Sequence, residues 1–396
     1  MDNSAKTITR GELLSRAQNM LPLLEENAEK AEANRRIPKA TDKAFREAGF
    51  YKIMQPTKFG GYELEFGTQT ELAIILAPGC ASSAWMASVT ACHGWLLGMF
   101  PPKAQKDVWN NNPDASIASS FLPFAPKIKR VEGGLRVSGR WGFSSGVDYC
   151  SWAILTMKVP SKDKPKKNQS VFALVPLENC QILDTWYATG LAATGSNDIL
   201  IENVFIPDYR TVDMLSLRGG LSPGSEINPG YLYRLPQRAT FSYNLVGTAI
   251  GAARGALEAI ISELKSRVTV SGNSLSDLTS VHFRIAEAEA EISAAYALMT
   301  RNRDEIICNG KADIVLPAEQ RARYRRDNAF VTKLCVQAVD RLYPITGGRG
   351  LSITNKVNRA WRDVHAVSHH IALTWDVSAS VSGAIATGAP LSDPLL

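Results

Sequence analysis

The chain has 396 residues, of which 45% are hydrophobic and 21% are charged, a balance typical of globular proteins rather than disordered or fibrous ones. The formal net charge is +6, but part of the excess lies in a Pro- and Lys-rich stretch at 158–169, which indicates a solvated loop and not the basic, aromatic-interleaved stripe of a nucleic-acid binder. The six cysteines lack C-x-x-C spacing, the first residues lack a signal-peptide profile, and no apolar run approaches ~18 residues. These features predict a cytoplasmic protein with no nucleic-acid or membrane partner.

The first third of the sequence has the spacing of helices. A Thr-x-x-Glu capping box opens an amphipathic pattern over 9–36. A short helix is expected at 41–48, and the apolar run at 68–98 predicts two helices separated by a Pro-Gly pair. Proline in a first helical turn predicts another helix at 101–109.

The hydrophobic period changes after about residue 115. Residues 128–146 alternate about a Glu-Gly-Gly turn, which predicts a β-hairpin. Strand-like runs follow between turn signals: WAILTMKV, SVFALVPL, CQILDTWY and NDILIENVFIP. A loop rich in Gly and Pro at 217–230 separates these strands from the rest of the chain.

Helical spacing returns from about residue 237 in four long segments, which is typical of a bundle. The order of helices, strands and helices differs from the alternation of a doubly wound sheet. We therefore predict an α+β multidomain fold. It has an N-terminal α-helical domain (1–114), a central antiparallel β-barrel-like domain (115–212) and a C-terminal four-helix bundle (213–396).

A Gly-x-x-x-Gly-x-x-x-Gly pattern at 247–255 lies within a predicted helix and follows no strand. It is therefore not a dinucleotide fingerprint, and it predicts close helix packing instead. The sequence does not indicate NAD binding through a Rossmann unit.

Three of the five histidines fall in RAWRDVHAVSHHIALTWD (359–376): His365, His369 and His370. His365 and His369 have the i,i+4 spacing that places two imidazoles on one helix face, as in some metal sites. No Glu follows His365 as a zincin motif requires. We therefore expect proton handling and no metal here.

The order of domains resembles the acyl-CoA dehydrogenase fold, and the resemblance covers almost the whole chain. Three stretches carry it: GRWGFSSGVDYCSWAIL, GLAATGSNDILIENVFIPDYRTV and ITGGRGLSITNKVNRAWRDVHA. They are similar to the family's strand beside the flavin, its last barrel strand, and its Gly-rich loop with the Arg-Asp pair of the last helix. Ala192 stands where many relatives have an Arg, which leaves the detailed flavin contacts and the substrate open.

Dehydrogenases of this fold commonly carry a catalytic Glu nine residues after the Arg of that pair, and here Ile371 occupies the position. The nearby histidines, the SSG of the barrel strand and ACHGW (91–95) instead resemble the oxygenase components of two-component aromatic hydroxylases. That resemblance implies reduced flavin (FMNH2 or FADH2), O2 as cosubstrate and a C4a-hydroperoxyflavin. The implied reaction is hydroxylation of a phenolic or related aromatic substrate.

The resemblance implies three catalytic residues. Ser145 corresponds to the hydroxyl beside flavin N5, although a serine before a glycine at the end of a strand is also an ordinary turn residue. His369 corresponds to the base that deprotonates a phenol, and the ordinary pKa of histidine near 6.5 suits that task. His93 lies on an apolar helix, where a core histidine is the competing interpretation.

Further residues are implied in binding, although several aromatic ones would serve equally well as core. Expected flavin contacts are Ser144, Ser145, Trp141, Phe143, Thr194, Ser196, Arg267, Gly347, Gly348 and Arg349. Expected substrate contacts are Trp85, Phe121, Tyr243 and His365.

The implied partners are a separate NAD(P)H:flavin reductase and a small aromatic substrate. Flavin phosphate contacts in this fold can come from a neighbouring subunit, which implies a homotetramer built as a dimer of dimers. An acyl-CoA dehydrogenase or oxidase, an N- or S-oxygenating member of the fold, and a non-catalytic relative stay open as alternatives. The choice between FMN and FAD also stays open.

Overall fold

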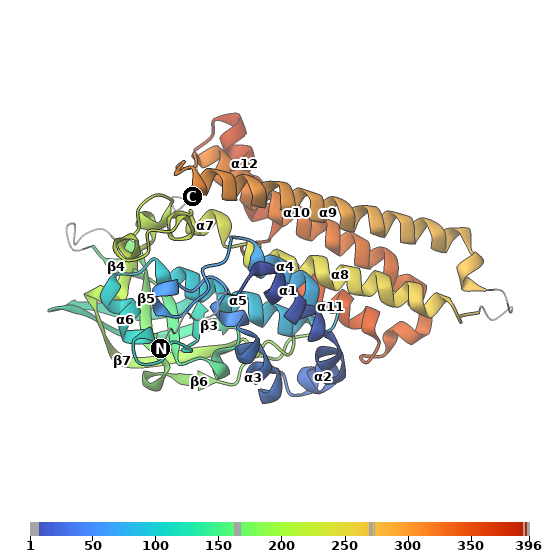
Figure 1. The fold of residues 1–396 in the computed structure, drawn as a ribbon, viewed down its shortest axis with the longest axis horizontal. Coiled ribbons are helices and arrows are strands. Elements are labelled where there is room, and N and C mark those ends of the chain that lie inside the picture. Colours follow the sequence, from blue (N-terminus) through green and yellow to red (C-terminus); the bar gives the residue numbers. More distant parts are fainter. Residues whose placement is uncertain (1–7, 162–167, 269–271, 273, 391–392, 394–396) are drawn as a thin grey trace, which may run out of the picture.

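The order of elements along the chain is helical, then β, then helical (Figure 1). The computed structural model describes residues 8–161, 168–268, 272, 274–390 and 393. The predicted Lys-rich loop falls largely on 162–167, which lie outside the described residues. The predicted fold class is confirmed, whereas the domain boundaries at 114 and 212 stay predictions.

Six helices make up the first part: α1 (Arg10–Asn19), α2 (Leu21–Ala33), α3 (Lys39–Ala48), α4 (Thr68–Leu76), α5 (Ala81–Gly98) and α6 (Pro102–Trp109). The capping box at the start of α1 is formed, since Thr9 and Glu12 exchange side-chain and backbone hydrogen bonds. The predicted helix over 9–36 is divided at Met20. Every side chain of α5 is buried, so this helix is the centre of the first part.

The β part consists of two four-stranded sheets, ordered β1-β4-β5-β8 and β2-β3-β7-β6. Their strands are β1 (Ile117–Ser120), β2 (Leu122–Val131), β3 (Gly134–Ser144), β4 (Trp152–Pro160), β5 (Asn168–Pro176), β6 (Gln181–Leu183), β7 (Asn197–Pro207) and β8 (Thr211–Asp213). The predicted hairpin is β2–β3, with Val131 opposite Gly134. All strand pairs are antiparallel except β1 with β4, which is parallel.

The end of β3 is irregular where it approaches the helices. The register between β3 and β7 shifts between Trp141 and Ser144, and Phe143 has a positive φ of 63°, rare for a residue with a side chain. A bulge of this kind redirects the following side chains. Ser145 comes directly after this strand.

The last part is built of α7 (Gln237–Thr240), α8 (Tyr243–Leu264), α9 (Thr279–Lys311), α10 (Ala318–Leu342), α11 (Lys356–Ser368) and α12 (Trp375–Thr387). The four long helices α8 to α11 form the predicted bundle, and the C-terminal ends of α8 and α10 lie far from the sheets (Figure 1).

By length and composition, the segment Gln237–Leu264 is long and apolar enough to cross a membrane, contrary to the expectation that no apolar run approaches that length. Most of this apolar segment is buried inside the protein. A core helix of a bundle passes the same test, so the finding is weak evidence for a membrane span.

The glycine pattern in α8 packs against α4, as predicted. A Cβ at Gly247 would overlap the carbonyl oxygen of Thr70, and one at Gly251 would overlap that of Ile74. Gly255 lies against Pro78. The glycines therefore let two backbones approach where α5 must also fit.

We expect Gly251→Ala to lower the free energy of unfolding by about 1–3 kcal/mol, because the added methyl group meets rigid backbone. Gly383→Ala in α12 is the matched control, since nothing lies within 4 Å of its Cβ position. The control should be neutral or stabilising by up to about 1 kcal/mol. Urea denaturation measures both, and equal effects of the two changes would contradict the packing role.

Candidate functional site

The Ser145 hydroxyl lies where the helical and β parts meet. It accepts a hydrogen bond from Trp85 Nε1 of α5 at 3.1 Å and lies 2.8 Å from the hydroxyl of Ser196. Ser145 is half-buried, whereas Trp85 and Ser196 are buried. The serine is therefore partly exposed, and its hydroxyl is held by two buried partners.

A tight turn supports this serine from behind. Thr194 Oγ1 lies 2.7 Å from Ser196 Oγ and donates to the carbonyl oxygen of Leu191 at 2.8 Å. The same carbonyl accepts from the backbone N–H of Thr194 and from Trp186 Nε1, both at 3.1 Å. The turn is thus fixed by several bonds that end on one oxygen atom.

The turn is also bound to α11. Asp363 accepts a hydrogen bond from the backbone N–H of Leu191 at 2.6 Å. Burial raises the pKa of the Asp363 carboxyl to about 6, and the Leu191 N–H and Arg362 oppose that rise. Arg362 also donates to the carbonyl oxygen of Thr189 at 2.6 Å. The Arg-Asp pair therefore fastens the loop before β7 to the last long helix of the bundle.

Two residues beside Ser145 have side chains that the described residues satisfy only in part. The buried Ser144 hydroxyl has no hydrogen-bond partner among the described residues. Phe143 is 59% exposed, and its ring meets Trp186 edge-on at 6.0 Å. An unsatisfied buried hydroxyl and an exposed ring are expected where a flat polar ligand completes the site.

Four aromatic rings form a continuous cluster next to Ser145. The ring of Trp85 lies 5.7 Å from that of His370, and His370 lies 6.2 Å from Phe241. Phe241 in turn meets Phe121 edge-on at 5.2 Å. These rings come from α5, the end of α11, the α7–α8 junction and the β1–β2 junction, so all parts of the fold contribute to one apolar wall.

His370 is neutral, and its tautomer is fixed. Burial lowers the pKa of its imidazole to about 4. Its Nδ1 accepts the backbone N–H of Ala372 at 3.1 Å, so in the neutral ring the proton lies on Nε2. His370 therefore presents an N–H donor in the aromatic cluster.

His93 is neutral with the opposite tautomer. Its Nδ1 lies 2.8 Å from the carbonyl oxygen of Ile117, which can only accept, so this nitrogen carries the proton. Its Nε2 then accepts from the Ser119 hydroxyl at 2.6 Å. Burial lowers the pKa of this imidazole to about 4. The Ser119–His93 pair is thus a proton-accepting unit at the start of the sheet.

The structure does not bring His369 to the aromatic cluster. Helix α11 ends at Ser368, and His369 is its exposed C-cap residue. The helical period therefore no longer decides which side the next residues face, and His370 turns inward. His365 lies on the half-exposed face of α11, where it bonds Asp340 at 2.9 Å and contacts Trp361, away from the role expected for a substrate contact.

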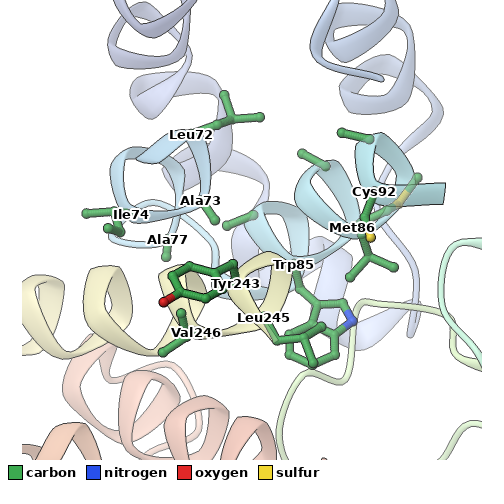
Figure 2. Close-up of a cluster of buried hydrophobic side chains, with 14 of the residues drawn as sticks. Leu72, Ala73, Ile74, Ala77, Trp85, Met86, Cys92, Tyr243, Leu245 and Val246 are labelled. Carbon is green, nitrogen blue, oxygen red and sulfur yellow. The ribbon is translucent and has the colours of Figure 1, made fainter. Parts of the chain in front are cut away.

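Two aromatic residues expected at the site belong to the core. Tyr243 is fully buried between α4 and α8, and its hydroxyl points away from Trp85 (Figure 2). Trp141 is fully buried in the core of the β part and donates to the carbonyl oxygen of Thr156 at 2.8 Å. Helix and strand periodicity make such residues equally compatible with core and site, and packing decides.

The residues expected at a flavin phosphate lie elsewhere in the same chain. Arg267 donates to the carbonyl oxygens of Ile345 and Thr346 at 3.1 and 2.9 Å. It therefore holds the exposed loop that carries Gly347, Gly348 and Arg349. This loop follows α10 at the bundle end remote from the sheets (Figure 1). One chain alone does not bring it to Ser145.

Three residues of the site were missed in the sequence. Phe241 carries no local motif, and only the fold brings it to the aromatic cluster. Ser119 carries none either, and only the fold brings it to His93. His370 was noted as one of the three clustered histidines but was given no role at the site. The signal that could have favoured it is the position of the family's glutamate, Ile371, because both lie just past the end of the helix.

Comparisons with known proteins agree with this architecture. The family model described as Acyl-CoA dehydrogenase, N-terminal domain, matches residues 18–111, and Acyl-CoA dehydrogenase, C-terminal domain, matches residues 243–375. The solved structure of 3-HSA hydroxylase from Rhodococcus sp. RHA1 superposes with a TM-score of 0.92 at 32% identity, covering 97% of this chain and 99% of that one.

Similar sequences carry related descriptions. The FADH(2)-dependent resorcinol hydroxylase, oxygenase component, of Rhizobium sp. (strain MTP-10005) is 34% identical over 391 residues, with 96% of this chain and 95% of that protein covered. The p-hydroxyphenylacetate 3-hydroxylase, oxygenase component, of Acinetobacter baumannii is 31% identical, with 94% and 88% covered.

The two neutral histidines predict a loss of stability in acid. The folded-state pKa of His93 is about 4, below the unfolded value near 6.5, so the unfolded chain binds the extra proton between these values. The contribution of His93 to the free energy of unfolding should therefore be fully present above pH 6.5. It should fall by about 2 kcal/mol between pH 7 and pH 5. Urea denaturation of His93→Gln should show a flatter pH dependence than the wild type, and parallel curves would contradict the assignment.

Proposed function

Because the chain belongs to the acyl-CoA dehydrogenase-fold oxygenase components of two-component flavin-dependent monooxygenases, we propose that it hydroxylates a phenol with reduced flavin and O2. A separate flavin reductase supplies the reduced flavin. One observation carries the proposal: Trp85 donates to the Ser145 hydroxyl while its ring faces His370. Trp85 thus contacts both a hydroxyl suited to flavin N5 and the aromatic cluster in which a flat ring could bind.

Bound reduced flavin would supply the two electrons that activate O2. Ser145 would hold its N5 proton, and the unpaired Ser144 hydroxyl and the exposed Phe143 would complete contacts beside it. The buried surroundings of Ser196 and Thr194 keep water from the inner side of Ser145. These residues therefore fit the cofactor by their chemistry.

We assign proton removal from the phenol to the Ser119–His93 pair and not to His369. Ser119 donates to His93 Nε2, so its oxygen is left to accept the hydroxyl proton of a phenol. A proton can then pass to His93, which is neutral and ready to accept it. A developing phenolate would raise the pKa of His93 in the complex, because an opposite charge favours the imidazolium.

His370 would have a complementary task. Its Nε2–H is a neutral donor, so it could hold an oxygen atom of a substrate beside the aromatic cluster without adding charge. The rings of Phe121 and Phe241 would pack against a flat aromatic substrate.

The acyl-CoA dehydrogenase alternative lacks support in the residues of the site. Dehydrogenation of a thioester requires a base, commonly a carboxylate, facing the substrate. At the family's position stands Ile371, which is 63% exposed. The nearest carboxyl of α11, Asp363, is engaged by the Leu191 N–H.

We further propose a homo-oligomer, a tetramer by analogy with the fold, and a cytoplasmic location. Arg267 and the glycine loop can serve as phosphate contacts only for a site in another copy. The same bundle end exposes apolar side chains: Ile261, Val268, Leu351 and Ile353. Such a patch on a soluble chain favours contact with a second copy. The six free cysteines support a reducing compartment.

The proton-removal role is tested by Ser119→Ala, with His369→Gln as the control. We expect Ser119→Ala to slow product formation about 100-fold, while O2 is still consumed and released as H2O2. A more acidic phenol, already ionised at the working pH, should restore much of the rate. His369→Gln should behave as the wild type. Loss of hydroxylation in His369→Gln but not in Ser119→Ala would contradict the assignment.

The assembly is tested with two leucines of equal exposure. Leu351 is 77% exposed beside the glycine loop, and Leu221 is 78% exposed in the loop before α7. We expect Leu351→Asp to lower the mass measured by light scattering and to weaken flavin binding, whereas Leu221→Asp should change neither. A monomeric wild type, or an unaffected Leu351→Asp, would refute the proposed interface.

A further inference from the structure

We propose that the Leu191 carbonyl orders the protons of three hydroxyls, those of Thr194, Ser196 and Ser145, so that Ser145 presents an acceptor and the site prefers reduced over oxidised flavin. Thr194 and Ser196, which the sequence suggested as direct flavin contacts, are assigned instead as positioning residues that act through Ser145. This inference rests on the proposed flavin site and explains its choice of redox state.

The order of protons follows from counting donors. A carbonyl oxygen can only accept, so the 2.8 Å bond from Thr194 Oγ1 to Leu191 uses the single proton of Thr194. Thr194 must therefore accept from Ser196 across 2.7 Å. Ser196, with its proton used, must accept from Ser145 across 2.8 Å.

Ser145 is left with two lone pairs. One of them takes the indole N–H of Trp85 at 3.1 Å. The second lone pair accepts no hydrogen bond from the other two hydroxyls. Ser145 is also the only one of the three that is half-exposed. A ligand that reaches the exposed side of Ser145 therefore meets an acceptor.

The three hydroxyls could also donate in the opposite direction, but one hydrogen bond would then be lost. If Thr194 donated to Ser196, and Ser196 to Ser145, then Ser145 would accept twice and donate outward. The bond from Thr194 to Leu191 would then be lost. One neutral hydrogen bond corresponds to about a fivefold preference, so the observed anchor biases the chain toward the acceptor state.

The anchor itself is rigid. Leu191 has a positive φ of 50°, and its N–H is held by Asp363 at 2.6 Å. A Cβ at the preceding Gly190 would overlap the carbonyl group of Arg362, so the loop cannot come closer to α11. The direction of the Leu191 carbonyl is therefore fixed by a contact with Asp363, which lies 172 residues further along the sequence.

The two flavin states differ at the atom that this hydroxyl would meet. Reduced flavin carries a proton on N5 and donates there, whereas oxidised flavin has a bare N5 and accepts. An acceptor at Ser145 matches the reduced form directly. The oxidised form requires that the three hydroxyls donate in the opposite direction, which loses the Thr194–Leu191 hydrogen bond.

The test is the ratio of dissociation constants for oxidised and reduced FMN and FAD, measured by anaerobic titration with flavin fluorescence or absorbance. Thr194→Val removes the anchor, and Ser196→Ala frees the proton of Ser145. Both should lower the preference for reduced flavin about fivefold. Thr194→Ser keeps the hydroxyl and should restore the wild-type ratio.

Ser82→Ala is the matched control. The Ser82 hydroxyl accepts the backbone N–H of Ala193 at 3.2 Å, so it supports the same loop but lies outside the chain of hydroxyls. Its loss should leave the ratio unchanged. An unchanged ratio in Thr194→Val and Ser196→Ala, or an equal drop in Ser82→Ala, would overturn the inference. Failure of the wild type to bind either flavin state would instead refute the proposed function.

Discussion

The hydrogen bond from the Trp85 indole to the Ser145 hydroxyl joins the helical and β parts of this protein at the site. Helix α5 is buried along its whole length, so the indole has a fixed position and direction. The bulge at the end of β3 brings Ser145 to that indole, with a strained backbone at Phe143. The site therefore depends on two separate parts of the fold meeting at one hydroxyl.

The loop before β7 is the second element on which the site depends. It contacts Ser145 through Ser196, α5 through Ser82, and α11 through Asp363. Because α11 leads to His370, this helix positions both the three linked hydroxyls and the imidazole donor. A shift of α11 would alter both together, so the buried Asp363 couples the position of the loop to that of the imidazole.

Periodicity was enough to predict the order of elements, the β2–β3 hairpin and the packing role of the glycines in α8, since these depend on local spacing. The division of the first helix at Met20 has a local cause that the periodicity did not include, since Pro22 lies in the first turn of α2 and cannot continue α1. The parallel pair β1–β4 depends on tertiary packing, which spacing does not record. In the site, Ser145 could be found because the SSG motif is local. Phe241 could not, since its neighbours Phe121 and His370 are far away in the sequence.

The histidines show why residue type alone is not enough to assign a role. His93 and His370 are both neutral because burial lowers their pKa, yet their partners give them opposite chemistry. The Ile117 carbonyl forces the proton of His93 onto Nδ1 and leaves Nε2 to accept. The Ala372 N–H forces the proton of His370 onto Nε2 and makes it a donor. In each histidine, one backbone group thus decides whether the imidazole can take a proton from a phenol. The sequence shows neither of these contacts.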